Sequence, residues 1–235
     1  MTAESNDLAI DARPAPVSAA AAHTAVIVVD MQNDFAHAEG MFGRAGIDIS
    51  IIRAAIAPTR LVLDAARSAG VKVVYLKMGF AADMSNAGAV DSPNFLKHAP
   101  LGAGTEVQAP DGSASRILIR DTWNTEIIDE LRPQPGDTVV YKHRFSGFFE
   151  TPLHELLQTA NITTLLFVGA TTSICVESTV RDAMFRDYHC LLVEDCMAEP
   201  IGAGRPTSNH DASLLSMQIL FGSITDSGSV LRALG

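Results

Sequence analysis

Uninterrupted apolar runs recur along the chain and alternate with segments of helical periodicity. A strand with no polar face must be covered on both sides, so this pattern is typical of a parallel sheet between two layers of helices. Right-handed crossovers then give a doubly wound, Rossmann-like α/β fold. The runs cover residues 25–29, 71–76, 138–141, 163–168 and 190–194, with a short sixth near Ile224. The sequence therefore predicts a single-domain α/β protein.

The remaining segments connect and cover these strands. We expect helices over residues 51–68, 124–131, 152–159, 176–185 and 210–220. Residues 79–122 are irregular and rich in Gly, Ser, Pro and Asp, and a loop of that length in a compact domain is usually functional. Residues 1–22 are polar and then rich in Ala and Pro, which predicts a flexible N-terminal arm before a domain over residues 23–235.

The composition excludes several classes of function. The 235 residues are 47% hydrophobic, enough for one substantial core, and the net charge of −10 disfavours nucleic acid or an anionic membrane as main partner. No apolar run approaches the roughly 20 residues of a membrane span, and the N-terminal segment lacks the order of a signal peptide. Three cysteines cannot all form disulfides with one another. We therefore expect a cytoplasmic protein with no nucleic-acid or membrane partner.

Cys175 is the strongest candidate for a nucleophile. It lies between the apolar run 163–168 and the helical segment 176–185, at a strand-to-helix turn. Backbone N–H groups and the positive end of the helix dipole at such a turn favour the thiolate. A buried free cysteine is more commonly inert, which is our interpretation of Cys190 and Cys196.

Two further reactive side chains follow apolar runs: Asp30 the first and Lys142 the third. Ligands of doubly wound sheets bind beyond the carboxyl ends of the strands, so Asp30, Lys142 and Cys175 can converge on one crevice. There a thiolate would attack a carbonyl, a carboxylate would carry the proton to the leaving amine, and a lysine would stabilise both ions. Alone, an Asp there is more commonly a turn former and a Lys a surface charge. Only the combination predicts an enzyme.

The residues around these three positions resemble the isochorismatase-like cysteine hydrolase superfamily. The matching blocks are residues 28–35 (VVDMQNDF), Lys142 and residues 169–176 (GATTSICV), in that order. The resemblance spans about residues 23–234 and implies a six-stranded parallel sheet. It also implies that Asp30 is the base and proton shuttle, Lys142 its electrostatic partner and Cys175 the nucleophile.

The same resemblance implies how the reacting carbonyl is held. Superfamily members have a cis peptide bond a few residues before the cysteine, which here is the bond between Ala170 and Thr171. The N–H groups of Thr171 and Cys175 would then form the oxyanion hole, a contribution often worth roughly 3–4 kcal/mol. Nicotinamidases of the superfamily place an Asp-x-His metal motif after the second strand. Residues 77–80 (KMGF) offer no ligand there, so we expect no metal and no other cofactor.

Four further blocks resemble the ureidoacrylate amidohydrolases of pyrimidine degradation: residues 92–95, 129–137, 144–149 and 175–179. This resemblance implies cleavage of a C–N bond in a small ureido (carbamoyl) compound, with release of ammonia and carbon dioxide or carbamate. Those enzymes carry Asn-Gly-Trp after the second strand, whereas this chain has Met78-Gly79-Phe80, which alters the pocket wall. Biuret or triuret hydrolysis and N-carbamoyl amino acid hydrolysis are the alternatives.

Six residues are candidate substrate contacts. The aromatic rings among them could enclose a planar ureido group, the amide and hydroxyl could bind its N–H or C=O groups, and the guanidinium could hold a substrate carboxylate. Core packing for the rings and a surface ion pair for the guanidinium are equally good interpretations. The six are Phe35, Phe80, Asn94, Arg144, Phe145 and Ser146.

Two other classes of protein fit the sequence less well. A non-catalytic binding protein on the same fold has no need of all three reactive side chains. A nucleotide-binding dehydrogenase would carry a G-x-G-x-x-G motif after the first strand, where Asp30-Met31-Gln32-Asn33 stands instead. The superfamily resemblance also implies a homo-oligomer.

Overall fold

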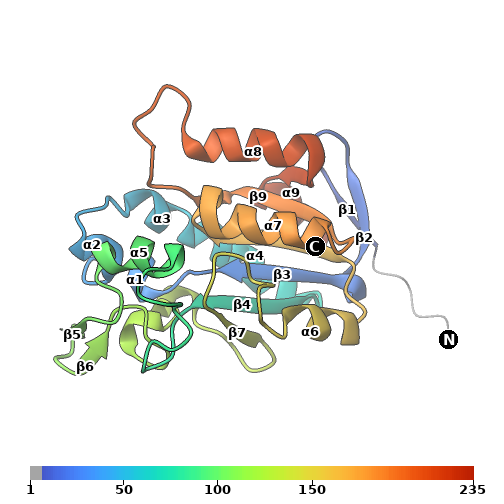
Figure 1. Cartoon of the computed structure of the whole chain (residues 1–235). Coiled ribbons are helices and arrows are strands. Elements are labelled where there is room, and N and C mark those ends of the chain that lie inside the picture. Colours follow the sequence, from blue (N-terminus) through green and yellow to red (C-terminus); the bar gives the residue numbers. More distant parts are fainter. Residues whose placement is uncertain (1–6) are drawn as a thin grey trace.

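Strand β3 (Thr24–Val29) is buried along its whole length because it lies inside a six-stranded parallel sheet. The computed structural model describes residues 7–235 of the chain. The other strands of this sheet are β4 (Lys72–Met78), β7 (Thr138–Lys142), β8 (Thr164–Ala170), β9 (His189–Ala198) and β10 (Ser223–Thr225). Their order is β10-β9-β8-β3-β4-β7, and every neighbouring pair is parallel (Figure 1). The predicted doubly wound α/β fold is confirmed.

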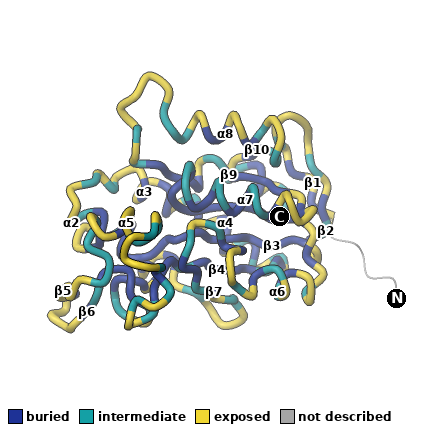
Figure 2. Tube along the Cα trace, viewed as in Figure 1, coloured by how far each residue is buried: buried dark blue, intermediate teal, exposed yellow. Residues whose placement is uncertain are grey.

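Two layers of helices cover the sheet, and β3 supplies both cores. Val26 and Val28 pack with α4 (Ile56–Ser68) and α9 (Ser227–Leu234), whereas Ile27 and its neighbours two residues away face the opposite layer. That layer contains α6 (Leu153–Thr159), α7 (Glu177–Met184) and α8 (Asn209–Leu220). Figure 2 shows the strands as the buried centre of the molecule. Burial on both faces is why these strands lack polar alternation.

The segments between the strands hold several short elements. The long segment 79–122 contains α5 (Pro93–His98), the 3₁₀ turn η2 (Ala99–Leu101) and a hairpin of β5 (Glu106–Gln108) and β6 (Ala114–Arg116). After β3 come α1 (Asn33–Ala36), α2 (Met41–Arg44) and α3 (Ser50–Ala54). The helix expected over residues 51–68 is divided at Ala55, three residues before Pro58, which has no N–H to donate to the carbonyl of Ala54 in a continuous helix.

The helix expected over residues 124–131 is absent. Two 3₁₀ turns, η3 (Trp123–Thr125) and η4 (Asp129–Leu131), stand in its place. Between them Ile127 forms a bridge with Gln32, and the Ile128 N–H donates to the carbonyl of Met31 at 3.1 Å. Backbone pairing with the segment after β3 therefore overrides the local helical pattern.

The prediction of a flexible arm over residues 1–22 is wrong for the part that the structure describes. A hairpin of β1 (Asp7–Ile10) and β2 (Val17–Ala20) precedes the 3₁₀ turn η1 (Ala21–His23). Leu8 and Ile10 are buried, and Arg13 pairs with Glu194 at 2.6 Å. The alternation of buried and exposed residues in β1 was a strand signal too short to distinguish from a polar tail. Residues 1–6 lie outside the described residues.

Candidate active site

Asp30, Lys142 and Cys175 meet at the carboxyl edge of the sheet. Asp30 directly follows β3, Lys142 ends β7, and Cys175 lies in the π-helical turn η5 (Thr172–Val176) that follows β8. The Lys142 Nζ lies 2.7 Å from the Asp30 Oδ2 and 3.3 Å from the Cys175 Sγ. These side chains come from three different strand ends, so the sheet itself sets their spacing. We call Asp30, Lys142 and Cys175 the triad.

The backbone around the triad brings the strand ends unusually close. Gly169 pairs with Val29, and a Cβ on Gly169 would lie 2.1 Å from the Val29 carbonyl oxygen, so only glycine fits. The peptide bond between Ala170 and Thr171 is cis. Asp30 has a φ of 50°, and its N–H donates to the Leu76 carbonyl at 2.9 Å. The chain therefore turns sharply at both β3 and β8 where they present reactive groups.

The triad is almost completely removed from solvent. Lys142 is 0% exposed, Asp30 1% and Cys175 7%. Burial raises the pKa of Asp30, against the opposing effect of the Lys142 charge. Burial also acts against the Lys142 ammonium, but the neighbouring Asp30 and Cys175 outweigh it and raise the pKa of Lys142. The site therefore holds a buried ammonium that is stabilised by its two triad partners.

The thiol differs from what a helix terminus alone would produce. Burial raises the pKa of Cys175, although the Lys142 charge acts in the opposite direction. We expected the helix dipole to favour the thiolate, and here desolvation outweighs that effect. Cys175 therefore rests as a thiol, and a thiolate forms only if a nearby group takes its proton.

Asp30 is placed to take that proton. The Asp30 Oδ2 lies 2.7 Å from the Lys142 Nζ, and hydrogen bonds from the Cys175 thiol and the Met78 backbone N–H also act to lower the pKa of Asp30. The ammonium is otherwise occupied by Cys175 and by the Arg144 carbonyl at 3.4 Å. The Cys175 side chain is therefore within reach of this carboxylate, which can accept the thiol proton.

Comparison with known proteins identifies the family of this chain. The chain matches the isochorismatase domain over residues 24–229. It belongs to the isochorismatase family. The predicted superfamily is thereby confirmed.

Named relatives of this isochorismatase-family protein are similar over most of their length. It is 42% identical over 191 residues to a ureidoacrylate amidohydrolase of Rhizobium rhizogenes, covering 81% of this chain and 76% of the relative. A ureidoacrylate amidohydrolase of Cronobacter sakazakii is 38% identical over 97% of this chain and 96% of its own. These names agree with the predicted enzyme class, a hydrolase of amide bonds.

Solved structures share the fold. A cysteine hydrolase from Pseudomonas syringae pv. phaseolicola superimposes with a TM-score of 0.75 at 28% identity, covering 92% of this chain and 94% of the other. An N-carbamoylsarcosine amidase from Thermoplasma acidophilum gives a TM-score of 0.62 at 27% identity, covering 87% of this chain and 96% of the other.

Two of the candidate substrate contacts lie against a histidine that the sequence analysis left without a role. The ring of His98 contacts the ring of Phe80 edge-on at 5.4 Å and that of Phe145 at 5.5 Å. Phe80 is fully buried and Phe145 is 37% exposed. Burial, together with the charges of Lys142 and Arg144, lowers the pKa of His98. His98 therefore lies near the triad as a neutral ring. Its Nδ1 lies 2.8 Å from the carbonyl oxygen of Asn94, and this spacing of four residues was its only signal in the sequence.

The polar candidates are engaged with other parts of the chain. Asn94 donates to the Ala87 carbonyl at 2.9 Å, and Arg144 donates to the Asn86 carbonyl at 2.9 Å, so both hold the same loop. The Ser146 hydroxyl donates to the Asp182 carboxylate on α7. These contacts show how the pocket wall is anchored, and substrate contacts by Asn94, Arg144 and Ser146 stay predictions.

Phe35 is the candidate with the most ordinary surroundings. It is buried in the core and contacts Phe42 edge-on at 4.9 Å. The ring pair agrees with the core-packing interpretation of Phe35. Phe35 nevertheless lies only five residues after Asp30 in the chain.

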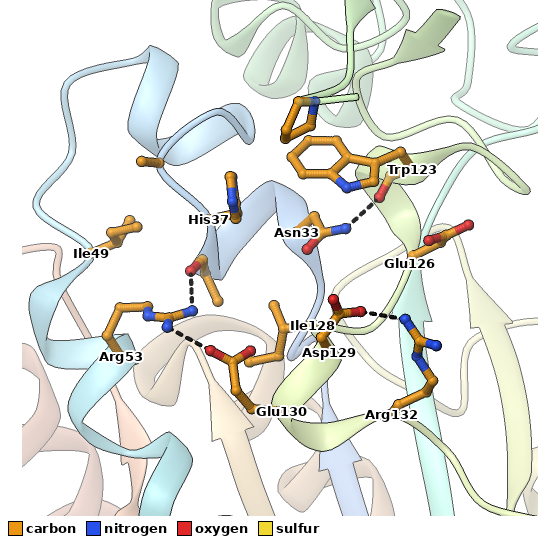
Figure 3. Close-up of a pocket in the computed structure, with 13 residues that line it drawn as sticks. Asn33, His37, Ile49, Arg53, Trp123, Glu126, Ile128, Asp129, Glu130 and Arg132 are labelled. Atoms are coloured by element: carbon orange, nitrogen blue, oxygen red, sulfur yellow. Dashed lines mark hydrogen bonds and ion pairs between the residues drawn. The ribbon is translucent and has the colours of Figure 1, made fainter. Parts of the chain in front are cut away.

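A cavity that is separate from the triad opens beside α1. It has a volume of about 650 Å³, and none of the triad residues lines it. Figure 3 shows that four of its charged side chains are paired, Arg53 with Glu130 and Arg132 with Asp129. Asn33 donates to the Trp123 carbonyl across its floor. The cavity is therefore a different feature from the candidate active site.

Within residues 7–235, no three His, Cys, Asp or Glu side chains are grouped as metal ligands. Across the same range, no helix combines the length and the apolar character needed to cross a membrane.

Proposed function

We propose that this protein hydrolyses a C–N bond of a small ureido compound such as ureidoacrylate, with Cys175 as the nucleophile. The observation that carries the proposal is the buried contact of the Lys142 ammonium with both Asp30 and Cys175. The relatives named as ureidoacrylate amidohydrolases, two of which cover 81% and 97% of this chain, support the ureido substrate. The products are an amine and carbamate, which decomposes to ammonia and carbon dioxide.

The first half of the reaction forms a carbamoyl-enzyme. Asp30 accepts the thiol proton of Cys175 as the sulfur forms a bond to the ureido carbonyl carbon. The carbonyl oxygen takes up negative charge and is stabilised by the N–H groups of Thr171 and Cys175. The C–N bond then breaks, and the proton held by Asp30 passes to the departing nitrogen. Lys142 keeps its charge throughout and stabilises each anionic partner in turn.

The second half returns the enzyme to its resting state. Water attacks the carbonyl carbon of the thioester and gives a proton to Asp30. The C–S bond breaks, Asp30 returns the proton to the sulfur of Cys175, and carbamic acid leaves and ionises to carbamate by releasing a proton to solvent. One water is consumed, and the triad ends with the protons it began with.

Arg144 would recognise a carboxylate on the substrate. The guanidinium is half-buried next to Phe145, and no carboxylate of residues 7–235 forms an ion pair with it. An arginine without an acidic partner can hold a substrate carboxylate through paired hydrogen bonds. Ureidoacrylate and N-carbamoyl amino acids carry such a group, whereas biuret and triuret do not.

N-carbamoyl amino acid hydrolysis is the second candidate. The solved N-carbamoylsarcosine amidase, with a TM-score of 0.62, favours it. Met78-Gly79-Phe80 also stands where the ureidoacrylate enzymes carry Asn-Gly-Trp, so the pocket wall differs from theirs. A cytoplasmic location and a homo-oligomeric state stay predictions.

The test is ammonia release by the purified protein with ureidoacrylate, N-carbamoyl amino acids, biuret and triuret, ranked by kcat/KM. We expect turnover of the carboxylate-bearing compounds and its loss in Cys175→Ser. Cys190→Ser is the matched control, because Cys190 is also buried but lies on β9 away from the triad. Full activity of folded Cys175→Ser, or no turnover of any compound, would overturn the proposal.

A further inference from the structure

A buried carboxylate holds the turn that carries Cys175. Glu199 directly follows β9 and is 2% exposed. Its Oε2 accepts hydrogen bonds from the Ser173 N–H at 3.0 Å and the Ser173 hydroxyl at 2.5 Å. Its Oε1 accepts from the Ile201 N–H at 3.0 Å. No ion pair with a cation of residues 7–235 accounts for this buried acid.

The three donors explain why a carboxylate is needed. Two oxygens receive three hydrogen bonds, two of them from backbone N–H groups that can only donate. An ionised carboxylate only accepts hydrogen bonds. In a glutamine, the NH₂ group would face one N–H donor, and the two donors could not form a hydrogen bond. Removing the side chain altogether would leave the half-buried Ser173 N–H and hydroxyl without their acceptor.

The position of Ser173 connects this contact to the chemistry. Ser173 lies two residues after Thr171 and two before Cys175, in the middle of η5. The neighbouring Thr172 is held by a second side chain, since its hydroxyl lies 2.9 Å from the Nδ1 of His210 on α8. Two side chains from the segment after β9 thus fix the centre of a turn whose two ends supply the sulfur and the oxyanion-hole N–H groups.

We propose that Glu199 is a positioning residue for the nucleophile, which sets the location of the Cys175 sulfur and the Thr171 N–H through Ser173. This inference rests on the proposed nucleophilic role of Cys175. A displacement of η5 by about 1 Å would misalign the attacking sulfur with the carbonyl, and misplacements of that size can cost about 10²-fold in rate. Substrate binding would change little, because Phe80, Phe145 and Arg144 lie on other strand ends.

The test compares Glu199→Ala and Glu199→Gln with Asp195→Ala. Asp195, an exposed residue of the same strand β9, accepts from both the N–H and the hydroxyl of Ser227 at the start of α9, so it makes a similar pair of hydrogen bonds away from the triad. The readouts are kcat and KM with the best substrate of the ureido panel, and the thermal midpoint of unfolding.

We expect Glu199→Ala to lower kcat at least tenfold with KM within threefold of the wild type. Glu199→Gln keeps its carbonyl oxygen for the two Ser173 donors and loses the Ile201 bond, so kcat should stay within threefold although the thermal midpoint falls. Asp195→Ala should lower the midpoint and leave kcat within twofold. A merely structural role would make kcat follow the midpoint in all three variants.

The inference is overturned if folded Glu199→Ala keeps kcat within twofold, or if Asp195→Ala lowers kcat as much. If Glu199→Ala does not fold, Ser173→Ala removes the hydroxyl donor alone, and an unchanged kcat in that variant overturns the inference as well. Cys175→Ser separates the two proposals. Its inactivity beside a fully active Glu199→Ala defeats only the positioning role, whereas its activity defeats both.

Discussion

Replacing Lys142 by methionine removes the cation from the triad while keeping an unbranched side chain that is one atom shorter. In the wild type the ammonium lies 2.7 Å from Asp30 and is fully buried. Without it, Asp30 either remains as an uncompensated buried charge or takes up a proton. Removing one partner of a buried pair typically costs about 3–5 kcal/mol, and we expect Lys142→Met to lose that much free energy of unfolding at pH 8.

The loss must depend on pH in a defined direction. Burial already raises the pKa of Asp30 above 3.8, and loss of the Lys142 charge raises it further. Between the unfolded and the folded pKa values the folded state binds more protons, so the free energy of unfolding decreases as pH rises through this window. Each pH unit contributes about 1.4 kcal/mol, so the destabilisation should shrink between pH 8 and pH 5, by at most about 4 kcal/mol.

Urea unfolding at pH 5, 6, 7 and 8 measures this directly, with the fluorescence of the single tryptophan, Trp123, as one signal and circular dichroism as the other. Other groups titrate in the same range, among them Asp34, whose pKa burial raises to about 6, but they are present in every variant. Asp30→Asn/Lys142→Met is the control, because it has no carboxylate to ionise and should lose the extra pH dependence. A Lys142→Met profile parallel to that of the wild type would refute this account of the triad.

Two smaller perturbations test the substrate pocket and the N-terminal hairpin. Arg144→Gln should raise the KM at least tenfold for ureidoacrylate and N-carbamoyl amino acids and leave the KM for biuret within threefold. Arg53→Gln is the control, because Arg53 is paired at the surface with Glu130. An equal effect on the KM of all substrates in steady-state assays would contradict the carboxylate contact. Ile10→Ala should lower the free energy of unfolding in urea by about 2–5 kcal/mol, because Ile10 is fully buried between the hairpin and α9. A change below about 0.5 kcal/mol, the size typical of a surface substitution, would mean that the hairpin contributes no stability.

The sheet and the meeting of the triad could be predicted because both follow from local sequence and one topological rule. Strands such as β3 and β8 are apolar throughout, which only a sheet covered on both faces requires. Parallel strands place their carboxyl ends at one edge, so Asp30, Lys142 and Cys175 needed no knowledge of side-chain packing to be brought together.

The supporting residues could not be predicted in the same way. Glu199 reaches Ser173 across 26 residues of chain, and His98 lies against Phe80 and Phe145 through the folding of a long irregular segment. Neither contact leaves a periodic signal in the sequence. The hairpin over residues 7–20 was missed for a related reason, since its burial depends on packing against elements more than 200 residues away, such as β10 through Arg13.

The burial of the triad changes how its cysteine must be activated. Ionisation of Cys175 into solvent would leave two buried anions beside the single Lys142 charge, which explains why desolvation raises the pKa of the thiol. Transfer of the same proton to Asp30 leaves one anion and one cation, as in the resting site, so no net charge is created in the low-dielectric interior. The raised pKa is therefore compatible with catalysis only because Asp30 belongs to the same buried cluster. A strand-to-helix turn with a cysteine alone would give an inert thiol here, and in the proposed mechanism the pairing of Asp30 with Lys142 is what makes Cys175 a nucleophile.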